Sequence, residues 1–367
     1  MDILIDYRPA LRQRTGVGEY AHGLASALAT LLRPEDSLKL FSSSWKDRLQ
    51  PAVVAGAGQI DVRIPVRVLN FAWHRLEWPP VEWLAPSADV VHSTHPLLIP
   101  SRSAAQIVTI YDLHFLDRPE QTAAEIRRDY PALAASHARR ADGIVVISKH
   151  TAQQVSDRFG IEPQRITVCY PGNPAWPRRR EPAGAGPILF IGTTEPRKNL
   201  ARLIEAYAAL SERRGEVPDL VIAGAIPGSA DHLFAGTPES LRARVRLTGY
   251  VSDEERQRLY REASMLVLPS LTEGFGITAV EAMTVGVPVV ASNRGALPEV
   301  LGDAGILVNP EDACDLSNAL ERVLSDDGLR RSMAERGVLR ARQFSWTESA
   351  ERLYNAYHTA HRRRSTR

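Results

Sequence analysis

The chain has few cysteines, few lysines and no long apolar stretch. Its 367 residues include two cysteines without metal-ligand spacing, which excludes a disulfide framework and fits a reducing cytoplasm. No apolar run approaches the roughly 18 residues that span a membrane. Acidic residues, Asp2 and Asp6, stand where a signal peptide carries basic ones. The net charge of +2 is too small to indicate a nucleic-acid partner, so we expect a cytoplasmic protein that binds no nucleic acid.

The apolar pattern indicates an α/β protein with two domains. Hydrophobic residues make up 44% and charged residues 24%, which is typical of a soluble globular chain. Short apolar strands alternate with helical segments before and after a stretch rich in proline and glycine, 171–187, and this predicts two doubly wound parallel-sheet domains. We expect the domains at 1–175 and 188–344, a linker at 176–187 and a final segment, mostly one helix, at 345–367.

Individual elements follow from the same pattern. The predicted strands are 3–5, 38–41, 90–92, 106–111, 143–147, 166–169, 188–191, 220–223, 245–251, 265–268, 287–291 and 305–308. The predicted helices are 19–32, 123–140, 148–159, 200–213, 252–263, 277–283, 313–324, 329–342 and 345–361, with Ser148 and Ser252 as N-caps. Beyond one strand, residues 33–88 predict no firm structure. The aromatic residues between 70 and 84 are more typical of a core or a subdomain cap than of a ligand platform.

The most informative stretch runs from Glu273 to Glu281. An apolar strand leads into Gly-Phe-Gly at 274–276, a short helix follows, and a second apolar strand comes directly after it. Glycine lets a ligand approach the backbone closely, and a helix start offers unpaired N–H groups to phosphate or sugar oxygens. Carboxylates accept hydrogen bonds from sugar hydroxyls, so both glutamates are candidate binding residues. The alternative is a helix cap for Glu273 and a solvated helix face for Glu281.

This stretch resembles the Glu-x7-Glu signature of retaining, nucleotide-sugar-dependent glycosyltransferases of family 4, which have the GT-B fold. The resemblance continues through Pro288-Val-Val-Ala-Ser292, Leu297-Pro-Glu-Val300 and Gly302-Asp-Ala-Gly305. It implies two Rossmann-like domains facing across a cleft, with the final helix crossing back onto the first domain. It also implies transfer of a hexose, with mannose favoured, from a GDP- or UDP-linked sugar to a cell-surface glycan or a lipid-linked acceptor. No other cofactor is expected.

The resemblance assigns roles residue by residue. Glu281 would bind the ribose hydroxyls of the nucleotide, and Glu273 the hydroxyls of the transferred sugar. Backbone amides would contact sugar or phosphate, and these amides belong to Gly274, Phe275, Gly276 and Ile277. Retention of the anomeric configuration is implied. Same-face attack within an ion pair is favoured over double displacement, because no carboxylate is clearly placed to attack the anomeric carbon.

A second candidate site is the loop 192–199, which joins the first strand of the second domain to its helix. Ligands bind outside the carboxyl ends of such strands, and Arg197 and Lys198 place charge beside a helix start, which suits a diphosphate. A solvated basic turn is the alternative. The family often has Gly-Arg at the beginning of this loop, whereas this chain has Thr193 after the glycine, so Arg197 is expected to substitute. The sequence has no Asp-x-Asp motif, and these cations are expected to meet the phosphate charge without a metal.

The first domain offers a glycine-rich loop and a strand-end histidine. Gly16-Val-Gly18 fits the dinucleotide fingerprint weakly, since the loop before it is long. In the family the matching loop lies near donor phosphate and acceptor. Asp112-Leu-His114 ends a strand, and by resemblance His114 falls where the family places a histidine beside the transferred sugar. The alternatives are a plain turn for the glycines and a satisfied core histidine for His114.

Weaker interpretations concern two other histidines and the membrane. His92 and His95, at the end of the neighbouring strand, are weaker candidates than His114 for a site histidine. Peripheral contact with an anionic membrane is expected through the arginines at 127–128 and 139–140 and the tail 361–364, although a solvated helix face and a disordered tail explain them equally well.

Other functions on the same fold are a nucleotide-sugar 2-epimerase, a phosphorylase and a non-catalytic scaffold. A phosphorylase needs a pyridoxal-binding lysine, and none of the four lysines is a convincing one. A scaffold is disfavoured because Glu273, Glu281, Lys198 and His114 occur together.

Overall fold

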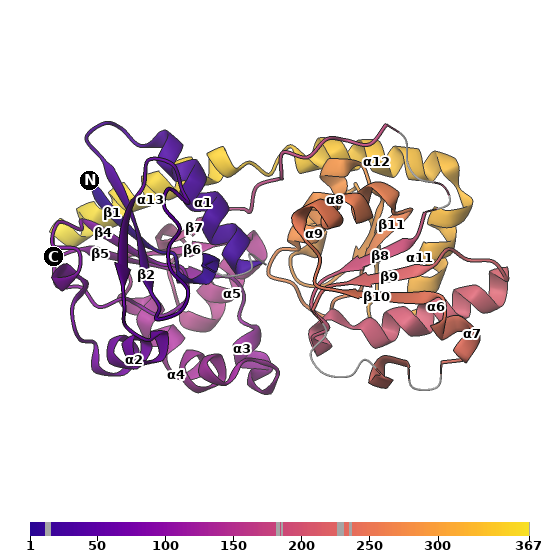
Figure 1. Ribbon diagram of the computed structural model, residues 1–367, viewed down its shortest axis with the longest axis horizontal. Coiled ribbons are helices and arrows are strands. Elements are labelled where there is room, and N and C mark those ends of the chain that lie inside the picture. The colour runs from indigo at the N-terminus through magenta and orange to yellow at the C-terminus, as the bar shows by residue number, and fades with distance from the viewer. Residues whose placement is uncertain (12–15, 181–183, 185, 226–230, 235–236, 367) are drawn as a thin grey trace. The chain divides into compact units, whose positions relative to one another are not determined.

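The chain folds into two compact units, shown as a computed structural model in Figure 1. Unit 1 consists of Met1–Gly172 and Ser345–Arg367, and unit 2 of Asn173–Phe344. The proline-rich stretch 176–187 is therefore grouped with unit 2. The structure describes every residue except 12–15, 181–183, 185, 226–230, 235–236 and 367.

Unit 1 is built on a seven-stranded, all-parallel sheet in the order β3-β2-β1-β4-β5-β6-β7. Its strands are β1 (Asp2–Asp6), β2 (Ser37–Ser43), β3 (Gly58–Val62), β4 (Val90–Ser93), β5 (Ala105–Ile110), β6 (Gly143–Val146) and β7 (Ile166–Val168). Helices cover both faces of a doubly wound sheet, so the inner strands are continuously apolar, as the run Ile3-Leu4-Ile5 predicts.

The helices of unit 1 include a long one from the end of the chain. They are α1 (Val17–Leu31), α2 (Val66–Phe71), α3 (His114–Asp117), α4 (Ala124–Arg140), α5 (Lys149–Phe159) and α13 (Trp346–Ser365). Helix α13 packs beside α1 and against β5, β6 and β7. Trp346 at its start needs a glycine opposite, because a Cβ added to Gly23 would lie 2.5 Å from the indole ring. The glycine therefore lets α13 approach α1 closely.

Unit 2 repeats the architecture with a six-stranded, all-parallel sheet in the order β10-β9-β8-β11-β12-β13. Its strands are β8 (Ile188–Ile191), β9 (Leu220–Ala223), β10 (Val245–Gly249), β11 (Met265–Leu268), β12 (Val289–Ser292) and β13 (Ile306–Val308). Its helices are α6 (Leu200–Arg214), α7 (Glu239–Arg242), α8 (Asp253–Glu262), α9 (Ile277–Val285), α10 (Leu297–Leu301), α11 (Ala313–Ser325) and α12 (Asp327–Ala341). Helices α6 and α11 pack together on one face, and α9 and α12 on the other (Figure 1).

The two predicted N-caps are confirmed. Ser148 Oγ accepts a hydrogen bond from the Thr151 amide at 3.0 Å, and Ser252 Oγ accepts one from the Glu255 amide at 3.2 Å. Between residues 33 and 88, where little was predicted, the structure adds β3, α2, a single π-helical turn η2 (Ala72–Leu76) and a 3₁₀ turn η3 (Val81–Trp83). The final helix continues to Ser365, so the interpretation of 361–364 as a disordered tail is wrong.

Candidate functional site

The strand order of unit 2 reverses between β8 and β11, which is where a doubly wound sheet binds its ligand. The loops that leave these two strands, 192–199 and 269–276, are joined by hydrogen bonds. Asn199 Nδ2 donates to the Pro269 carbonyl at 3.1 Å, and the Leu271 amide donates to the Arg197 carbonyl at 2.8 Å. The reversal therefore brings together the two loops that the sequence singled out separately.

Glu273 is the centre of this arrangement. Its side chain is 7% exposed, and Oε1 accepts hydrogen bonds from Lys198 Nζ at 2.6 Å and Ser270 Oγ at 2.7 Å. Arg197 NH1 lies 3.2 Å from Oε2. Burial favours the neutral acid, but the charges of Lys198 and Arg197 outweigh it and keep the pKa of Glu273 below its ordinary value. The interpretation of Glu273 as a helix cap is therefore wrong.

Arg197 connects Glu273 to a second carboxylate, Glu195, which the sequence analysis did not identify. Arg197 Nε donates to Glu195 Oε2 at 2.7 Å, and Thr193 Oγ1 donates to Oε1 at 2.7 Å. Burial opposes ionisation here too, and Arg197 still lowers the pKa of Glu195. Two carboxylates and two cations thus balance one another. Only the position of Glu195 within the glycine loop could have indicated it from the sequence.

Glu281 lies in α9 and faces α8. It is 3% exposed, so the interpretation as a solvated helix face is wrong. Tyr260 Oη donates to its Oε2 at 2.9 Å, and Arg256 NH1 lies 3.2 Å from its Oε1. The Arg256 guanidinium stacks over the Trp176 ring at 5.2 Å. These partners hold the carboxylate in one orientation. No local sequence pattern marks Tyr260 or Arg256, because both are spaced as ordinary helix residues.

The Gly-Phe-Gly loop serves to start α9. Gly276 has φ +97° and precedes Ile277, the first residue of the helix. The Phe275 side chain is 2% exposed and packs edge to face on Phe344, with ring centroids 5.3 Å apart. Because the Phe275 side chain is buried and Gly274 has none, the expected ligand contacts of these two residues would be made by their backbone. A helix start has amides without intrahelical partners, which suits a negatively charged or sugar ligand at the start of α9, although the Ala279 amide already donates to the Gly276 carbonyl at 2.9 Å.

Gly295 is expected to be required for the placement of Glu273. It has φ +62°, and an added Cβ would lie 2.6 Å from both the backbone nitrogen and the backbone oxygen of Glu273. Gly295→Ala is therefore expected to lower the free energy of unfolding by about 3 kcal/mol, through left-handed strain and overpacking. Gly56→Ala is the matched control, since φ is +78° but no described atom lies within 4 Å, and it should cost about 1 kcal/mol. Urea unfolding measures both, and equal costs would contradict the contact.

Unit 1 places the predicted Asp112 and His114 directly after β5. His114 is the first residue of α3, and its amide donates to Asp112 Oδ1 at 3.1 Å. Its Nε2 is buried and has no hydrogen-bond partner among the described residues. His114 therefore differs from a satisfied core histidine. It has an unused polar atom at the carboxyl end of the sheet.

Two other predictions in unit 1 have different outcomes. His92 is fully buried, with Nδ1 2.6 Å from Tyr357 Oη and Nε2 2.7 Å from Thr109 Oγ1, so the prediction of a site histidine is wrong there.

The glycine loop of unit 1 packs closely at the start of α1. Gly16 precedes α1 with φ +42°, and a Cβ added to Gly18 would lie 2.7 Å from the Pro9 carbonyl oxygen. Arg12 and Arg14, which precede Gly16 in the same loop, lie outside the described residues.

A buried polar cluster, which the sequence analysis missed except for His95, lies where the strand order of unit 1 reverses, between β1 and β4. Asp6 is fully buried and pairs with Arg8, with Oδ2 2.6 Å from NH2. Burial opposes its ionisation, but Arg8 holds the pKa of Asp6 well below its ordinary value. Arg8 NH1 donates to Asn70 Oδ1 at 2.7 Å, and His95 Nε2 lies 3.4 Å from Asp6 Oδ2. Burial lowers the pKa of His95 although Asp6 opposes it.

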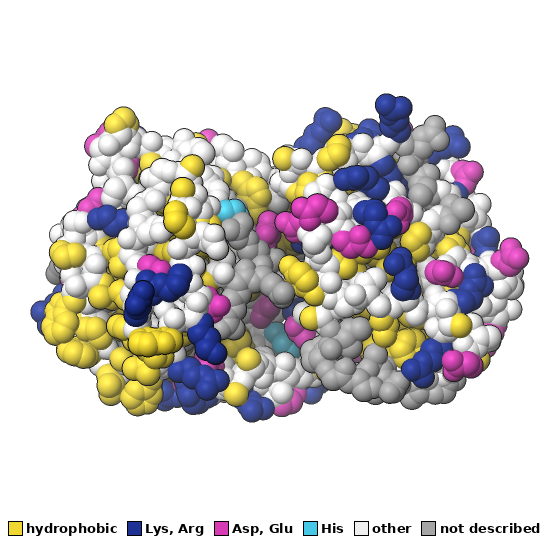
Figure 2. Space-filling model, in the orientation of Figure 1, with side chains coloured by type: hydrophobic (Ala, Val, Ile, Leu, Met, Phe, Trp, Pro, Cys, Tyr) yellow, Lys and Arg dark blue, Asp and Glu magenta, His cyan; other side chains and the backbone are white. Residues whose placement is uncertain are grey.

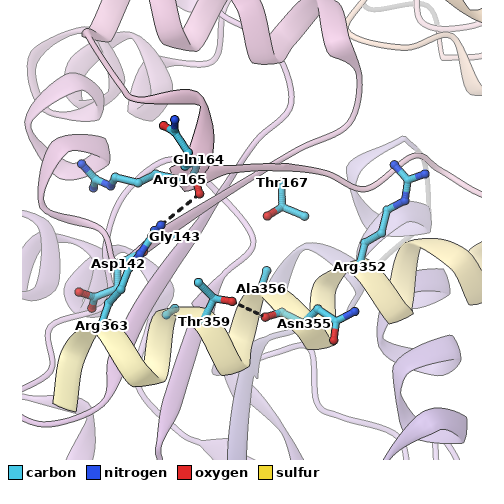
Figure 3. A pocket seen from close by; sticks show the side chains of 11 residues that line it. Asp142, Gly143, Gln164, Arg165, Thr167, Arg352, Asn355, Ala356, Thr359 and Arg363 are labelled. Carbon is cyan, nitrogen blue, oxygen red and sulfur yellow. Dashed lines mark hydrogen bonds between the residues drawn. The ribbon is translucent and has the colours of Figure 1, made fainter. Parts of the chain in front are cut away.

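A pocket of about 310 Å³ between α13 and the β6–β7 edge of unit 1 is a poor candidate for a ligand site (Figure 3). Its arginines do not converge. Arg165 and Arg352 point to opposite sides in Figure 3. Arg165 donates to the carbonyls of Ala138 and Arg139, and Arg363 to that of Gln164. The Arg165 bonds join the turn before β7 to the end of α4, and the Arg363 bond joins α13 to that same turn.

Among the residues that the structure describes, no three His, Cys, Asp or Glu side chains are grouped as metal ligands. In the same part of the chain, no helix combines the length and the apolarity that crossing a bilayer requires.

Two family models match the chain. The model described as Glycosyl transferases group 1 matches residues 178–340, and the model described as Glycosyltransferase Family 4 matches residues 14–173. The O-antigen chain mannosyltransferase B of Escherichia coli is 30% identical over 380 residues, which cover 97% of this chain and 99% of that protein.

Solved structures of low sequence identity share the fold. WaaG, described as a glycosyltransferase involved in lipopolysaccharide biosynthesis, has a TM-score of 0.72 at 17% identity, covering 97% of this chain and 99% of its own. Anabaena HepE, solved in complex with UDP and glucose, has a TM-score of 0.69 at 18% identity, covering 97% and 98%. The predicted GT-B fold, with its two Rossmann-like units, is confirmed.

Proposed function

The chain belongs to the family 4 glycosyltransferases, and we propose that it is a retaining hexosyltransferase that uses a nucleotide-diphosphate sugar. The observation that carries the proposal is the joining of Lys198, Arg197 and Glu273 at the strand reversal of unit 2, beside the first turn of α9. Cations and helix amides suit a diphosphate, and a carboxylate suits the hydroxyls of a sugar.

Donor binding is proposed to redistribute the existing ion pairs. Lys198 and Arg197 both contact Glu273, so an incoming diphosphate competes with that carboxylate for the same cations. The dipole of α9 adds a favourable field for the extra negative charge. As the cations turn to the phosphates, oxygens of Glu273 become available to accept hydroxyl hydrogens of the sugar. Glu281, oriented by Tyr260, is proposed to accept both ribose hydroxyls.

The reaction is proposed to proceed by same-face substitution. The bond between the anomeric carbon and the leaving phosphate oxygen breaks, and the acceptor oxygen forms a bond to the same face of that carbon. The acceptor proton passes to the departing diphosphate. Lys198 and Arg197 stabilise the charge that develops on this leaving group, which is a transition-state interaction. His114, with its unpartnered Nε2, and the neighbouring Asp112 are proposed to orient the transferred sugar.

Mannose is the favoured sugar, since a relative that covers 97% of this chain is described as an O-antigen chain mannosyltransferase. GDP is proposed as the leaving nucleotide of a mannosyl donor, and UDP is the alternative because HepE is solved with UDP. The acceptor is proposed to be a cell-surface glycan, built on a lipid carrier at the inner face of the membrane. Incubation with a panel of nucleotide sugars and a mannosyl oligosaccharide acceptor tests this, with acceptor-dependent release of nucleoside diphosphate as the readout. Sugar interconversion without transfer would instead support a 2-epimerase.

Activity is expected to survive metal removal. Lys198 and Arg197 already lie beside the proposed diphosphate position, so they can supply the positive charge that a divalent cation supplies in other transferases. Nucleoside diphosphate release is measured in EDTA and after addition of magnesium or manganese. Rates within about twofold of the untreated enzyme are expected. Loss of activity in EDTA with rescue by either metal would contradict metal-independent transfer.

The arginines first considered for membrane contact are partly engaged within unit 1. Arg128 NH2 pairs with Asp129 at 2.6 Å, Arg140 NH2 pairs with Glu77 at 2.7 Å, and Arg139 Nε donates to the Phe159 carbonyl at 3.0 Å. Ion pairs reduce the net charge that these helices offer to a lipid surface. These arginines alone are therefore a weak basis for a membrane contact, which needs further basic or apolar side chains on the same surface.

A further inference from the structure

Unit 1 exposes an unusual concentration of large apolar side chains, which we call the aromatic surface. Ten large apolar side chains are markedly exposed among the described residues, and five of them fall between positions 68 and 83. These five are Val68 (59%), Phe71 (53%), Leu76 (62%), Trp78 (52%) and Trp83 (59%). Figure 2 shows apolar side chains gathered, with Lys and Arg side chains beside them, in the region where Figure 1 places α2. Such patches mark interaction sites.

Buried residues of the same segment anchor the aromatic surface to the core of unit 1. Trp73, in the same segment, is fully buried, its ring centroid 5.2 Å from that of Phe41, and its Nε1 donates to the Pro79 carbonyl at 3.1 Å. Leu69 and Val81 join the same core cluster. The segment therefore buries one side and presents the other. The sequence predicts a core or a subdomain cap here, and Trp73 is core, whereas Phe71, Trp78 and Trp83 are exposed.

A basic pocket opens beside Trp78. It has a volume of about 370 Å³, and Arg102, Arg140 and Arg364 are among its lining residues. One exposed carboxylate, Glu77, lines it and pairs with Arg140. Nearby Glu82 is turned toward the backbone, where its Oε1 accepts hydrogen bonds from the amides of residues 102 and 103 at 2.8 and 2.9 Å. Three arginines against one exposed carboxylate make the pocket positive.

We propose that the aromatic surface docks on an anionic phospholipid bilayer, with the basic pocket taking a lipid phosphate group. The proposal rests on the proposed function in one respect, since a lipid-carried acceptor gives the docking a purpose. Tryptophan favours the boundary between acyl chains and headgroups, and arginine binds phosphate through paired donors. Tryptophan and arginine side chains lie together here, because Trp78 lines the basic pocket. Trp78 also packs edge to face on Trp83, with ring centroids 5.1 Å apart.

The charge of the pocket favours a lipid surface over a second copy of the chain. A two-fold contact between copies would bring the same patch against itself, so Arg102 and Arg364 would face their own counterparts. Such a contact opposes like charges, whereas an anionic bilayer complements them. The aromatic surface and the basic pocket are therefore read as one docking surface.

The test is flotation with vesicles of phosphatidylglycerol and phosphatidylcholine, compared with phosphatidylcholine alone, at low and high salt. The full chain is expected to float with anionic vesicles. Trp78→Ser with Trp83→Ser is expected to lower the partition coefficient at least about tenfold. Arg102→Gln with Arg364→Gln is expected to lower it about tenfold at low salt and little at high salt. Trp45→Ser is the matched control, because Trp45 is 68% exposed but lies outside the segment, and it should float as the unchanged chain does.

Several results would overturn the proposal. They are failure of the full chain to float on anionic vesicles at low salt, equal flotation of the double tryptophan variant, and a vesicle-free dimer that this variant abolishes. Melting curves confirm that each variant is folded. Nucleoside diphosphate release with a soluble glycan acceptor is measured in parallel, and the double tryptophan variant should retain it. If the full chain floats but releases no nucleoside diphosphate from any donor, the proposed function fails while the docking surface stands.

Discussion

Replacing Lys198 with alanine is expected to lower turnover at saturating donor by about 10²–10³, the scale seen when one fixed donor to a developing anion is removed. Lys198 Nζ lies 2.6 Å from Glu273, in the loop proposed to hold the diphosphate, and its side chain is 14% exposed. A cation beside the leaving group stabilises the transition state more than the ground state. The ion pair also adds a cost that the sequence alone does not predict. A buried carboxylate loses one cation, so the melting temperature should fall measurably.

Arg197→Ala is the informative comparison for Lys198→Ala. Arg197 is shared between Glu195 and Glu273, whereas in the described part of the chain Lys198 forms its ion pair with Glu273. Arg197→Ala is therefore expected to cost about tenfold in turnover, less than Lys198→Ala. Lys46→Ala, which removes an exposed lysine from unit 1, is the control and should leave turnover unchanged. Near-normal turnover of Lys198→Ala with loss in Arg197→Ala would reverse the two roles. If both variants stay active, the diphosphate lies elsewhere.

Replacing Glu281 with alanine is expected to raise the dissociation constant of the donor about 100-fold and to change turnover at saturating donor much less. Loss of two hydrogen bonds to a charged acceptor, each contributing about 1.5 kcal/mol, gives an effect of this order. The ribose is remote from the reacting bond, so its contacts act equally in the ground and transition states and appear in the Michaelis constant. Calorimetric titration with the donor measures the dissociation constant.

A more conservative substitution of Glu281 separates an effect on donor binding from an effect on folding. Glu281→Ala also removes the buried carboxylate that lies 3.2 Å from the Arg256 guanidinium, which keeps its ion pair with Asp253, and this loss destabilises the site. Glu281→Gln keeps the volume and one acceptor for Tyr260, so it should fold normally and bind the donor about tenfold more weakly. Glu262→Ala, at the exposed end of α8, is the control. An unchanged donor dissociation constant in both Glu281 variants would contradict the ribose contact.

The regular part of the fold follows directly from the sequence. Apolar runs such as 188–191 and 265–268 appear as strands with unchanged bounds, because a strand buried on both faces needs a continuous apolar segment. The structure of segment 66–83 could not be predicted from the sequence, because some of its tryptophans lie in the core and others on the surface. Trp73 is fully buried and Trp83 is 59% exposed, although both belong to the same aromatic-rich stretch. Only tertiary packing separates them.

The sequence indicates individual candidate site residues, but it does not predict the contacts between their side chains. Glu273 and Lys198 each stand in a recognisable loop, yet only the order of β8 and β11 shows that their side chains meet. The sequence also did not predict the burial of Glu273 and Glu281, since glutamates are usually solvated. Asp6 and Arg8 were missed for a related reason. The two residues pair locally, but the burial of Asp6 and its contact with His95 at 3.4 Å depend on β4, which neighbours β1 and is far from it in the sequence.

The most direct test of the account is the anomeric configuration of the product. The donor identified by the nucleotide-sugar panel is incubated with the acceptor, the product is isolated, and the configuration of the new glycosidic bond is read by NMR. Same-face substitution at the site of Lys198 and Glu273 predicts the configuration of the donor sugar, with one nucleoside diphosphate released per bond formed. An inverted linkage, or nucleoside diphosphate release without a new linkage, would contradict retaining transfer by this protein.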